Sequence, residues 1–430
     1  METTTLGSIP LTETVDVAVI GGGTAGAVAA IQSARAGANT CLIEIGPQLG
    51  GTMTTGGVSG PAYFFSRHRQ IIAGIGWELV TRTIELDGGS LPDFMAPNPR
   101  RPSYHVGINP YTYALLAEEA CLKAGVRLHY HETPVEIREE GDQWVIRTAG
   151  KSLQRTLRAK EIVDCTGDAD AVGLLGLPRV RDEIRQPGTL TFRLGGYDPD
   201  VLEEAVIQAR YEAALKDGTL RPGDFCYAHK PFRDYLRARG SNQQHIFGAD
   251  SSTSETQTQA SVAGRQGLLR MLRFLRTLPG CKQARIERMA PMAASRETWR
   301  IDGETWIRDE DYLAGRVFED AVCYSLYFID IHNEEGTQQQ FLPDHVIPTI
   351  PMGALIPRGS RRILVAGRNL ACDHAAFSAL RVEASCMAMG QAAGAAAALG
   401  VRRGQASRDV PVAELRDFLR TQGALVPEVS

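Results

Sequence analysis

The chain has 430 residues, of which 43% are hydrophobic and 22% are charged, as is usual for globular proteins. This length predicts two or three domains, and the composition excludes disorder, collagen and coiled coil as descriptions of the whole chain. The net charge of −4 offers no basic surplus for binding nucleic acid. The longest small-apolar run, near residues 392–399, is too short to cross a membrane, and residues 1–14 lack the features of a signal peptide. Eight scattered cysteines without a CxxC pair predict free thiols in a reducing cytoplasm.

The first predicted elements form a β-α-β unit. Residues 15–20 are a β-branched run typical of a buried strand, a helix rich in small residues follows to about residue 36, and residues 40–44 form the next strand. Such crossovers are almost always right-handed. Residues 50–60 contain five glycines and are not expected to form a regular element.

The remaining predicted elements alternate between two kinds of region. Residues 67–104 mix apolar turns with a Pro-rich stretch and are interpreted as an insertion. A helix is predicted at 110–124, with strands at 126–131, 135–139, 144–148 and 162–165. Amphipathic helices are predicted at 201–216, 262–278 and 309–328. Because these longer helices alternate with polar loops, unlike the preceding strands, this region is the candidate second domain. The last strand is expected at 362–366, and a long Ala-, Gly- and Met-rich helix at about 382–399.

The turn between the first strand and the first helix carries the motif Gly21-x-Gly23-x-x-Gly26. Gly21 allows a tight turn, Gly23 lets the backbone approach a pyrophosphate, and Gly26 allows the helix to pack closely on the strand. Glu44 ends the next strand, at the distance expected for an acid that binds ribose hydroxyls and repels a 2′-phosphate. The motif therefore predicts a site for FAD or NAD and not for NADP.

Three later segments favour FAD over NAD, since a simple NAD dehydrogenase needs none of them. The first is Gly50-Gly51-Thr52 after the second strand, where a second phosphate loop is expected. The others are Gly167-Asp168 after the strand at 162–165, and Gly367-Arg368 after the last strand. A large flavin nucleotide stretched across a discontinuous domain requires contacts from both ends of the chain.

The sequence resembles the FAD-dependent oxidoreductase family of glutathione-reductase-like flavoproteins with two-dinucleotide-binding-type domains, some of whose members are labelled xanthan-lyase-like. The resemblance rests on VDVAVIGGGTAGAVAAIQSARAGANTCLIE, LGGTMTTGG, VDCTGDADA, SRETWRIDG, FIDIH and ILVAGRNLACDHAAFSALRVEASCMAMGQAAGAAAA, which together run from residue 15 to about residue 400. RETWRIDG, IDIH and the C-terminal segment are the most specific of these.

The resemblance implies an α/β fold: a discontinuous Rossmann-like FAD-binding domain with a parallel sheet and an inserted α+β substrate domain. We expect FAD-binding parts at 14–66, 105–175 and 355–420, the insertion at 67–104, and a substrate or cap domain at 176–354. The family also implies that the last helix points its N-terminus at the flavin pyrimidine, which places Arg381 and Val382 near N1 and C2=O. Val135 matches a position that binds adenine through its main chain, although a β-branched strand residue is more often part of the core.

Two histidines in the family-specific segments are candidate proton acceptors, since flavin dehydrogenation needs a base on the substrate side. These are His332 and His374, with Arg381 as a further catalytic candidate. Asp330 shares a face with His332 if the segment is a strand. Arg296 and Arg300 could hold a substrate carboxylate, but these charged residues could equally tie the two domains together. Tyr324 and Tyr327 could stack on a substrate or belong to the core.

These features predict a cytoplasmic FAD-dependent oxidoreductase that dehydrogenates a C–O, C–N or C–C bond of a small molecule and passes electrons to oxygen or another acceptor. Two alternatives stay open: a two-component or tailoring flavin oxygenase, and a flavin-binding redox sensor or assembly partner without turnover. Residues 176–350 contain no second GxGxxG, the CxxxxC pair of disulfide reductases is absent, and no metal-ligand spacing stands out. We expect no metal, nucleic-acid or membrane partner, and the oligomeric state is open, with a homodimer as one option.

Overall fold

The structure, a computed structural model, describes residues 9–96, 104–225 and 231–429. Five parallel strands form the centre of the main sheet, in the order β5-β2-β1-β8-β18. Their bounds are Arg127–Tyr130 (β5), Thr40–Glu44 (β2), Ile9–Ile20 (β1), Leu153–Asp164 (β8) and Ile363–Val365 (β18). Because β18 comes from the C-terminal part of the chain and pairs with β8, the sheet is built from both ends of the sequence. This arrangement confirms the predicted α/β class with a discontinuous Rossmann-like domain.

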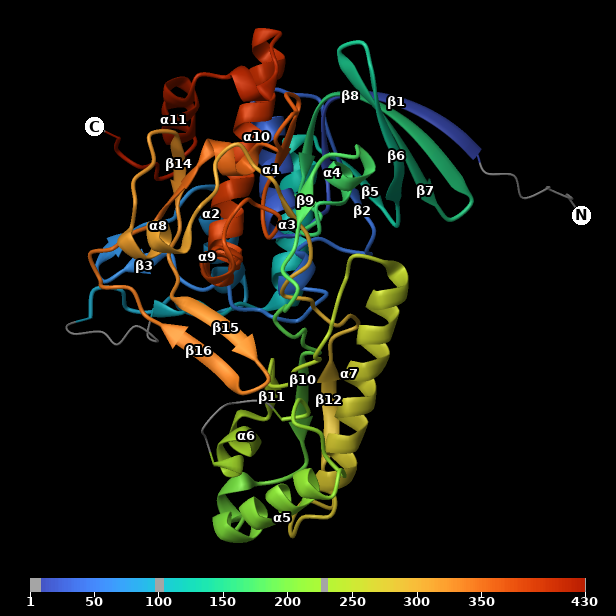
Figure 1. Ribbon diagram of the computed structural model, residues 1–430, viewed down its shortest axis with the longest axis vertical. Coiled ribbons are helices and arrows are strands. Elements are labelled where there is room, and N and C mark those ends of the chain that lie inside the picture. The colour runs from blue at the N-terminus through green and yellow to red at the C-terminus, as the bar shows by residue number, and fades with distance from the viewer. Residues whose placement is uncertain (1–8, 97–103, 226–230, 430) are drawn as a thin grey trace, which may run out of the picture.

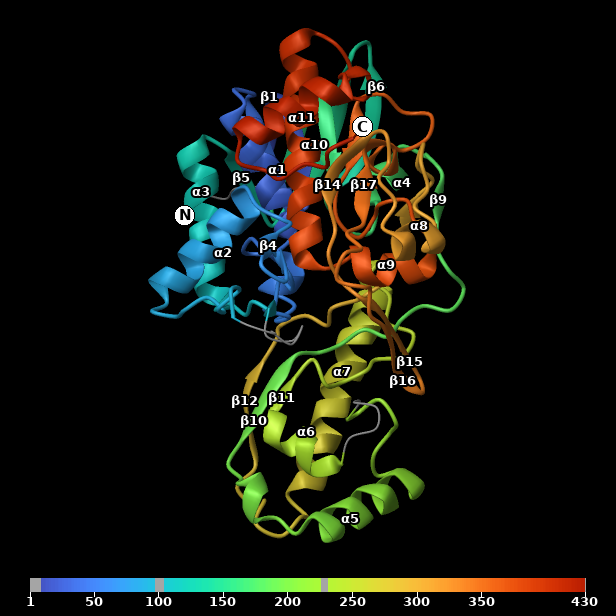
Figure 2. The same cartoon turned by 90° about the vertical axis from the view of Figure 1, so that its left-hand side faces the viewer.

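Helices packed against one another accompany this sheet (Figures 1 and 2). They are α1 Thr24–Arg35, α2 Ile75–Leu86, α3 Pro110–Ala124 and α10 Glu383–Arg403. The contact between α1 and α10 is very close, because a Cβ on Gly390 or Gly394 would lie 2.2 or 2.3 Å from a main-chain oxygen of α1. This close approach explains why the last helix is so rich in glycine and alanine.

The long strand β8 has two different neighbours along its outer edge. Its second half pairs with β18, whereas its first half pairs with β7. The preceding strand β6 forms an antiparallel hairpin with β7. The bounds of the two added strands are Thr133–Glu140 (β6) and Gln143–Gly150 (β7), and α4 Asp170–Leu174 contacts β6. The sheet therefore carries an antiparallel extension that the predicted parallel sheet did not include.

A second hydrophobic core lies below the first in Figures 1 and 2 and runs from Leu190 to Ala293. It joins a three-stranded sheet to the helices α5, α6 and α7. These are β10 Phe192–Gly195, β11 Gly240–Ser241, β12 Arg285–Met289, α5 Glu204–Lys216, α6 Phe232–Ala238 and α7 Ser254–Leu275. This unit is the inserted α+β domain expected from the sequence.

The change of core does not coincide with the domain boundaries expected from the sequence. Residues 301–356, expected largely in the substrate domain, contribute their buried side chains to the first core, as does α2 from the expected insertion at 67–104. The reason is that the strands β14 Ala321–Tyr324 and β17 Thr349–Pro351 pair with each other beside α10. Residues 97–103 of the expected insertion lie outside the described residues.

Two helices differ from their predictions. The helix expected at 309–328 is only α8 Asp309–Ala314, because Gly315 adopts the left-handed conformation that ends a helix and β14 follows. α10 is longer than expected and has the length and hydropathy of a membrane span. However, 89% of its most apolar 18-residue stretch is buried inside the protein. It is therefore the core helix of this fold.

The remaining elements are short. They are η1 Gly51–Met53, β3 Phe65–Ser66, β4 Arg69–Gln70, β9 Arg179–Val180, η3 Pro199–Val201, β13 Arg300–Ile301, β15 Ile329–Asn333, β16 Gly336–Gln340, η4 Met352–Leu355, α9 His374–Leu380, η5 Ser407–Asp409 and α11 Val412–Thr421. The hairpin β15–β16 lies near the junction of the two cores (Figure 1).

Candidate functional site

The turn from β1 to α1 has the geometry of a nucleotide-binding loop. Gly21 has a positive φ of 97°, and a Cβ on Gly26 would lie 1.8 Å from the Gly21 carbonyl oxygen. A Cβ on Gly23, in contrast, would meet no atom within 4 Å. Gly21 and Gly26 are thus required by the backbone itself, whereas Gly23 faces open space at the start of α1.

The start of α1 offers unpaired donors to a ligand. Thr24, Ala25 and Gly26 are buried, and among the described residues no side chain caps the helix. The N–H groups of a first helical turn have no partner within the helix, and with the helix dipole they favour an anion. The open space beside Gly23 therefore fits a pyrophosphate.

The carboxylate of Glu44 lies beside this turn. Its oxygens accept hydrogen bonds of 2.6 Å from the N–H groups of Gly22 and Gly46. Burial raises the pKa of Glu44, and the two N–H groups oppose that rise. Each carboxylate oxygen keeps a further lone pair, so the group can still accept a hydrogen bond from a ribose hydroxyl.

The second glycine loop packs directly on the first. The N–H of Gly50 donates to the carbonyl of Gly22 over 2.8 Å, and a Cβ on Gly51 would lie 3.0 Å from Cα of Gly23. Thr52 lies in the same short helical turn as Gly51. The structure therefore brings together Gly23, Gly51 and Thr52, as expected for two phosphate loops.

The segments after β8 and β18 meet through an ion pair. Nη2 of Arg368 lies 3.1 Å from Oδ1 of Asp168, and this oxygen also accepts a 2.5 Å hydrogen bond from the Thr298 hydroxyl. Gly167 and Gly367 both have positive φ, and a Cβ on Gly167 would lie 2.7 Å from the Arg368 guanidinium. Asp168 and Arg368 are thus engaged with each other at the sheet edge where the two segments end.

Val135 is not part of the core. Its side chain is 50% exposed, and it falls at a register shift in the β6–β7 pairing, where it has no cross-strand partner. Its backbone groups are therefore outside the ladder, which favours the adenine-binding interpretation over the core interpretation.

Arg381 does not begin the last helix. It caps the C-terminal end of α9, and Val382 is the N-cap of α10. Nη2 of Arg381 donates to Gln186 Oε1 and to the Asp330 carbonyl, each over 3.3 Å, whereas its buried Nε has no partner among the described residues. Glu383, the first residue of α10, has a pKa that burial raises to about 7.

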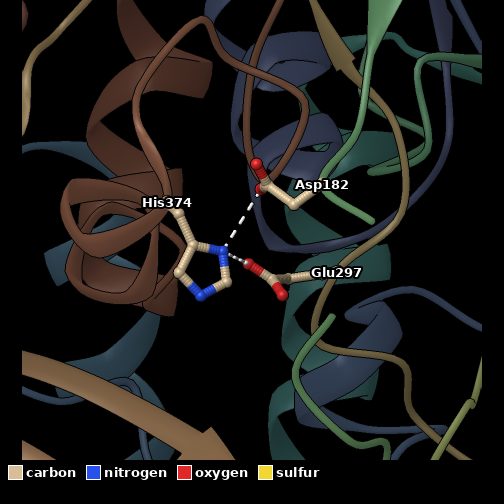
Figure 3. Close-up of side chains that lie close together, drawn as sticks. All are labelled: Asp182, Glu297 and His374. Atoms are coloured by element: carbon tan, nitrogen blue, oxygen red, sulfur yellow. Dashed lines mark hydrogen bonds and ion pairs between the residues drawn. The ribbon is translucent and has the colours of Figure 1, made fainter. Parts of the chain in front are cut away.

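His374 lies in an ion cluster at the start of α9 (Figure 3). Its Nδ1 lies 3.2 Å from Oδ2 of Asp182 and 3.1 Å from Oε1 of Glu297. Asp182 also pairs with Arg300 over 2.7 Å. Hydrogen bonds to the two carboxylates raise the pKa of His374 to about 9. The ring is therefore protonated at neutral pH, and this geometry argues against its predicted role as a base.

The donor atoms of the same three side chains lie within 4.8 Å of one another, which is the spacing of a metal site. However, Arg300 already neutralises Asp182, and a protonated His374 balances the charge of Glu297. A cation would have to displace that proton beside the arginine. The arrangement favours a closed ion network over a metal centre.

Asp330 and His332 do lie on one face of β15 and begin a chain of three side chains. Nε2 of His332 lies 3.1 Å from Oδ2 of Asp330, and its Nδ1 lies 3.0 Å from Nε2 of His245. His245 belongs to the inserted domain, next to Ile246 of the second core. The chain therefore joins the two cores.

Burial and two arginines hold this chain in one protonation state. Burial is the main cause that lowers the pKa of His332 to about 4 and that of His245 to about 3, and Arg296 adds to both shifts. The pKa of Asp330 is lowered, although burial opposes this, through its bonds to His332 and the charge of Arg381. At neutral pH the carboxylate is ionised and both rings are neutral.

The ionised carboxylate determines the tautomers. Asp330 can only accept, so His332 donates from Nε2 and accepts at Nδ1 from Nε2–H of His245. Nδ1 of His245 is then the unprotonated end of this set of side chains. The main chain of Asn333 lies near this ring and favours its protonated form.

Several residues of this junction were not singled out from the sequence. His245 lies in a polar stretch, SNQQHIF, without any motif, whereas Glu297 lies inside the quoted segment RETWRIDG. Gln186 connects the two groups, because its N–H donates to Glu297 and its side chain accepts from Arg381 and from the N–H of His332. Only the family-specific segment around Glu297 offered a signal that could have found it.

Comparison with known proteins decides the family. The profile described as FAD dependent oxidoreductase matches residues 16–419. The chain belongs to the FAD-dependent oxidoreductase family. Its cofactor is therefore FAD, and the loops at Gly23, Glu44 and Gly51 fit that nucleotide. No curated protein matches the sequence.

Three solved structures are examples of those similar to this FAD-dependent oxidoreductase. A geranylgeranyl bacteriochlorophyll reductase-like protein from Thermoplasma acidophilum is 12% identical over 96% of this chain and 84% of its own, with a TM-score of 0.48. An anhydrotetracycline hydroxylase from Streptomyces rimosus is 13% identical over 94% of this chain and 65% of its own, with a TM-score of 0.48. A p-nitrophenol 4-monooxygenase from Pseudomonas putida is 14% identical over 95% of this chain and 85% of its own, with a TM-score of 0.42.

Proposed function

We propose that this FAD-dependent oxidoreductase dehydrogenates a small organic molecule at the junction of its two cores. The observation that carries the proposal is the hydrogen-bonded set Asp330–His332–His245, in which a buried carboxylate and two neutral rings connect the two cores. Dehydrogenation needs a group that takes up a proton while hydride leaves the substrate. FAD, when bound, supplies the hydride acceptor.

The loops described above are proposed to hold this cofactor. Gly21, Gly23 and Gly26 with the start of α1 would take the pyrophosphate, and Glu44 the ribose. The other proposed contacts are Gly51, Thr52, Val135, Gly167, Asp168, Gly367, Arg368, Arg381 and Val382.

The three linked side chains Asp330, His332 and His245 would accept the proton as one unit. With Asp330 ionised and both rings neutral, it carries one negative charge, and uptake of a proton makes it neutral. When Nδ1 of His245 takes up a proton, the proton on its Nε2 can move to Nδ1 of His332. The proton on Nε2 of His332 can then move to the carboxylate of Asp330, so that both rings stay neutral. The low pKa values of the two rings keep both rings unprotonated at neutral pH.

Arg381 has a separate proposed role. It lies beside Asp330, and its partnerless Nε is a donor available to a ligand at the start of α10. Negative charge that develops on a flavin pyrimidine during reduction would be stabilised by this guanidinium and by the helix N-terminus. The proposal therefore separates proton uptake by the histidine chain from charge stabilisation by Arg381.

Anaerobic substrate screening tests the proposal. FAD-loaded protein is exposed without oxygen to a panel of alcohols, amines and saturated carbonyl compounds while the visible flavin absorbance is followed. Bleaching by an organic compound alone supports dehydrogenation. Bleaching only by a reduced nicotinamide or a partner reductase, followed by oxygen insertion into a product, would instead favour the oxygenase. Absence of bleaching under all conditions would favour a non-catalytic flavin-binding protein.

A further inference from the structure

A pocket lined by aromatic rings lies at the base of the β15–β16 hairpin. Its walls are formed mainly by Tyr63, Phe65, Tyr104, Tyr327, Phe328 and Leu342. Three of these rings pack on one another: Tyr327 and Phe328 are stacked with centroids 4.2 Å apart, and Tyr63 lies 5.4 Å from Tyr327. Rigid aromatic walls of this kind favour a flat, apolar ligand, which can offer its own ring to their faces and edges.

The polar rim of the pocket carries no net charge. Arg67 and Asp344 form an ion pair of 2.5 Å, and the Arg67 side chain is 67% exposed, which places the pair at the solvent side. Because the guanidinium is already neutralised by the carboxylate, it offers little to an anionic ligand. The pocket therefore favours a neutral molecule over an aromatic acid.

One polar atom inside the pocket lacks a partner. Tyr104 is only 4% exposed, and its hydroxyl makes no hydrogen bond with any described residue. A buried hydroxyl without a partner costs free energy, and buried tyrosines usually have one. Burial and the charge of Asp344 raise the pKa of Tyr104, so the group stays protonated and can donate. It is suited to bind an oxygen atom of a ligand.

The pocket borders the proton-accepting chain. Tyr327 lies three residues before Asp330, and the charges of Asp330 and Arg381 both act on its hydroxyl. The main chain of Tyr327 is held by the hydroxyl of Tyr312 over 3.0 Å. A molecule in the pocket would thus have its inner end near the group that is proposed to take the substrate proton.

We propose that this pocket binds the substrate, and that the substrate is a neutral, flat ring compound whose oxygen atom accepts a hydrogen bond from Tyr104. This inference rests on the proposed function for its link to catalysis, but the binding itself can be measured without turnover. Both the ring faces and the donor are required, so a saturated ring or a ligand without oxygen should bind less well.

Binding of 2-naphthol to the FAD-loaded protein, measured by equilibrium dialysis under anaerobic conditions, tests the pocket. We expect the saturated analogue decahydro-2-naphthol to bind at least roughly tenfold more weakly, since it lacks a flat face. Tyr104→Phe should weaken 2-naphthol binding about fivefold, the usual effect of one lost hydrogen bond. The matched control Tyr111→Phe removes an exposed hydroxyl of α3 and should leave the dissociation constant unchanged.

Equal affinity for the flat and saturated alcohols, or unchanged binding in Tyr104→Phe, would overturn the pocket assignment. The proposed function fails separately. If 2-naphthol binds as expected but no organic compound bleaches the flavin, the pocket stands and the dehydrogenase does not. If a compound from the screen bleaches the flavin at the same rate in Tyr104→Phe and Tyr327→Leu as in the parent, dehydrogenation stands and this pocket is not its substrate site.

Discussion

Replacing His374 with glutamine should lower the stability of the protein at neutral pH and hardly at all at alkaline pH. In the folded protein the pKa of His374 is raised from 6.5 to about 9 by Asp182 and Glu297. A raised pKa contributes stability that is fully present below the unfolded value and is lost as the pH rises through the folded value. The ion cluster of Figure 3 should therefore stabilise the fold fully below pH 6.5, and this contribution should decline as the pH rises to about 9.

The size of the effect follows from the shift in pKa. A rise from 6.5 to about 9 corresponds to at most about 3 kcal/mol of unfolding free energy. The His374 side chain is 32% exposed, and screening by solvent reduces the expected loss to about 1.5 kcal/mol at neutral pH. Glu297 is only 3% exposed and keeps the N–H of Gln186, so the loss should not be much smaller than this.

Urea unfolding of FAD-loaded parent and variant at several pH values measures the effect. The difference in unfolding free energy should be near its full size at about pH 6 and close to zero at about pH 10. His345→Gln serves as a control, because His345 is an exposed histidine. A difference that is the same at both pH values would refute the ion-cluster argument, and an increase in stability of the variant at neutral pH would show that the cluster is strained.

The remaining predictions concern the cofactor and the proton chain. Gly23→Val should yield folded but colourless protein, because a Cβ at this position meets no protein atom within 4 Å and the valine side chain would fill the pyrophosphate space; full flavin occupancy in the purified variant would contradict the assignment. Asp330→Asn should slow anaerobic flavin reduction about a hundredfold, and an unchanged rate would remove the chain from the mechanism. In the parent, that rate should be constant around neutrality and fall as the pH drops toward the pKa of His332, about 4; a fall beginning at alkaline pH would indicate another base. Arg381→Ala should lower the flavin midpoint potential in a spectroelectrochemical titration, whereas an unchanged potential would place the guanidinium away from the flavin. Neither NADH nor NADPH alone should bleach the flavin rapidly, since no second nucleotide motif is present, and rapid reduction by either would favour a monooxygenase or reductase.

Elements with strong local signals could be predicted closely. The strand at residues 40–44 and the helix at 110–124 have the predicted bounds. The helix begins after Asn109, whose side chain caps it, with proline in the first turn, and it ends at Gly125 in the left-handed conformation. Each of these signals acts over a few residues, so the sequence alone contains them.

Elements that depend on distant pairing could not be predicted as well. The supposed helix over 309–328 is mostly not helical, since β14 pairs with β17 more than twenty residues later. The strand expected at 162–165 is the end of the much longer β8, whose polar first half pairs with β1 and β7. These polar residues lack the apolar pattern of a buried strand, and only the neighbouring strands determine their conformation.

The candidate site divides in the same way. The sequence by itself determined the nucleotide loop, because Gly21, Gly23 and Gly26 act through the local backbone, and the family profile agrees with that reading. Only the tertiary structure decided the protonation of the histidines. His374 meets carboxylates from residues 182 and 297 and becomes a cation, whereas His332 is buried beside His245 from the other core and stays neutral. A histidine pKa is set by burial and by charges within a few ångströms, and those neighbours come from parts of the chain that only folding brings together.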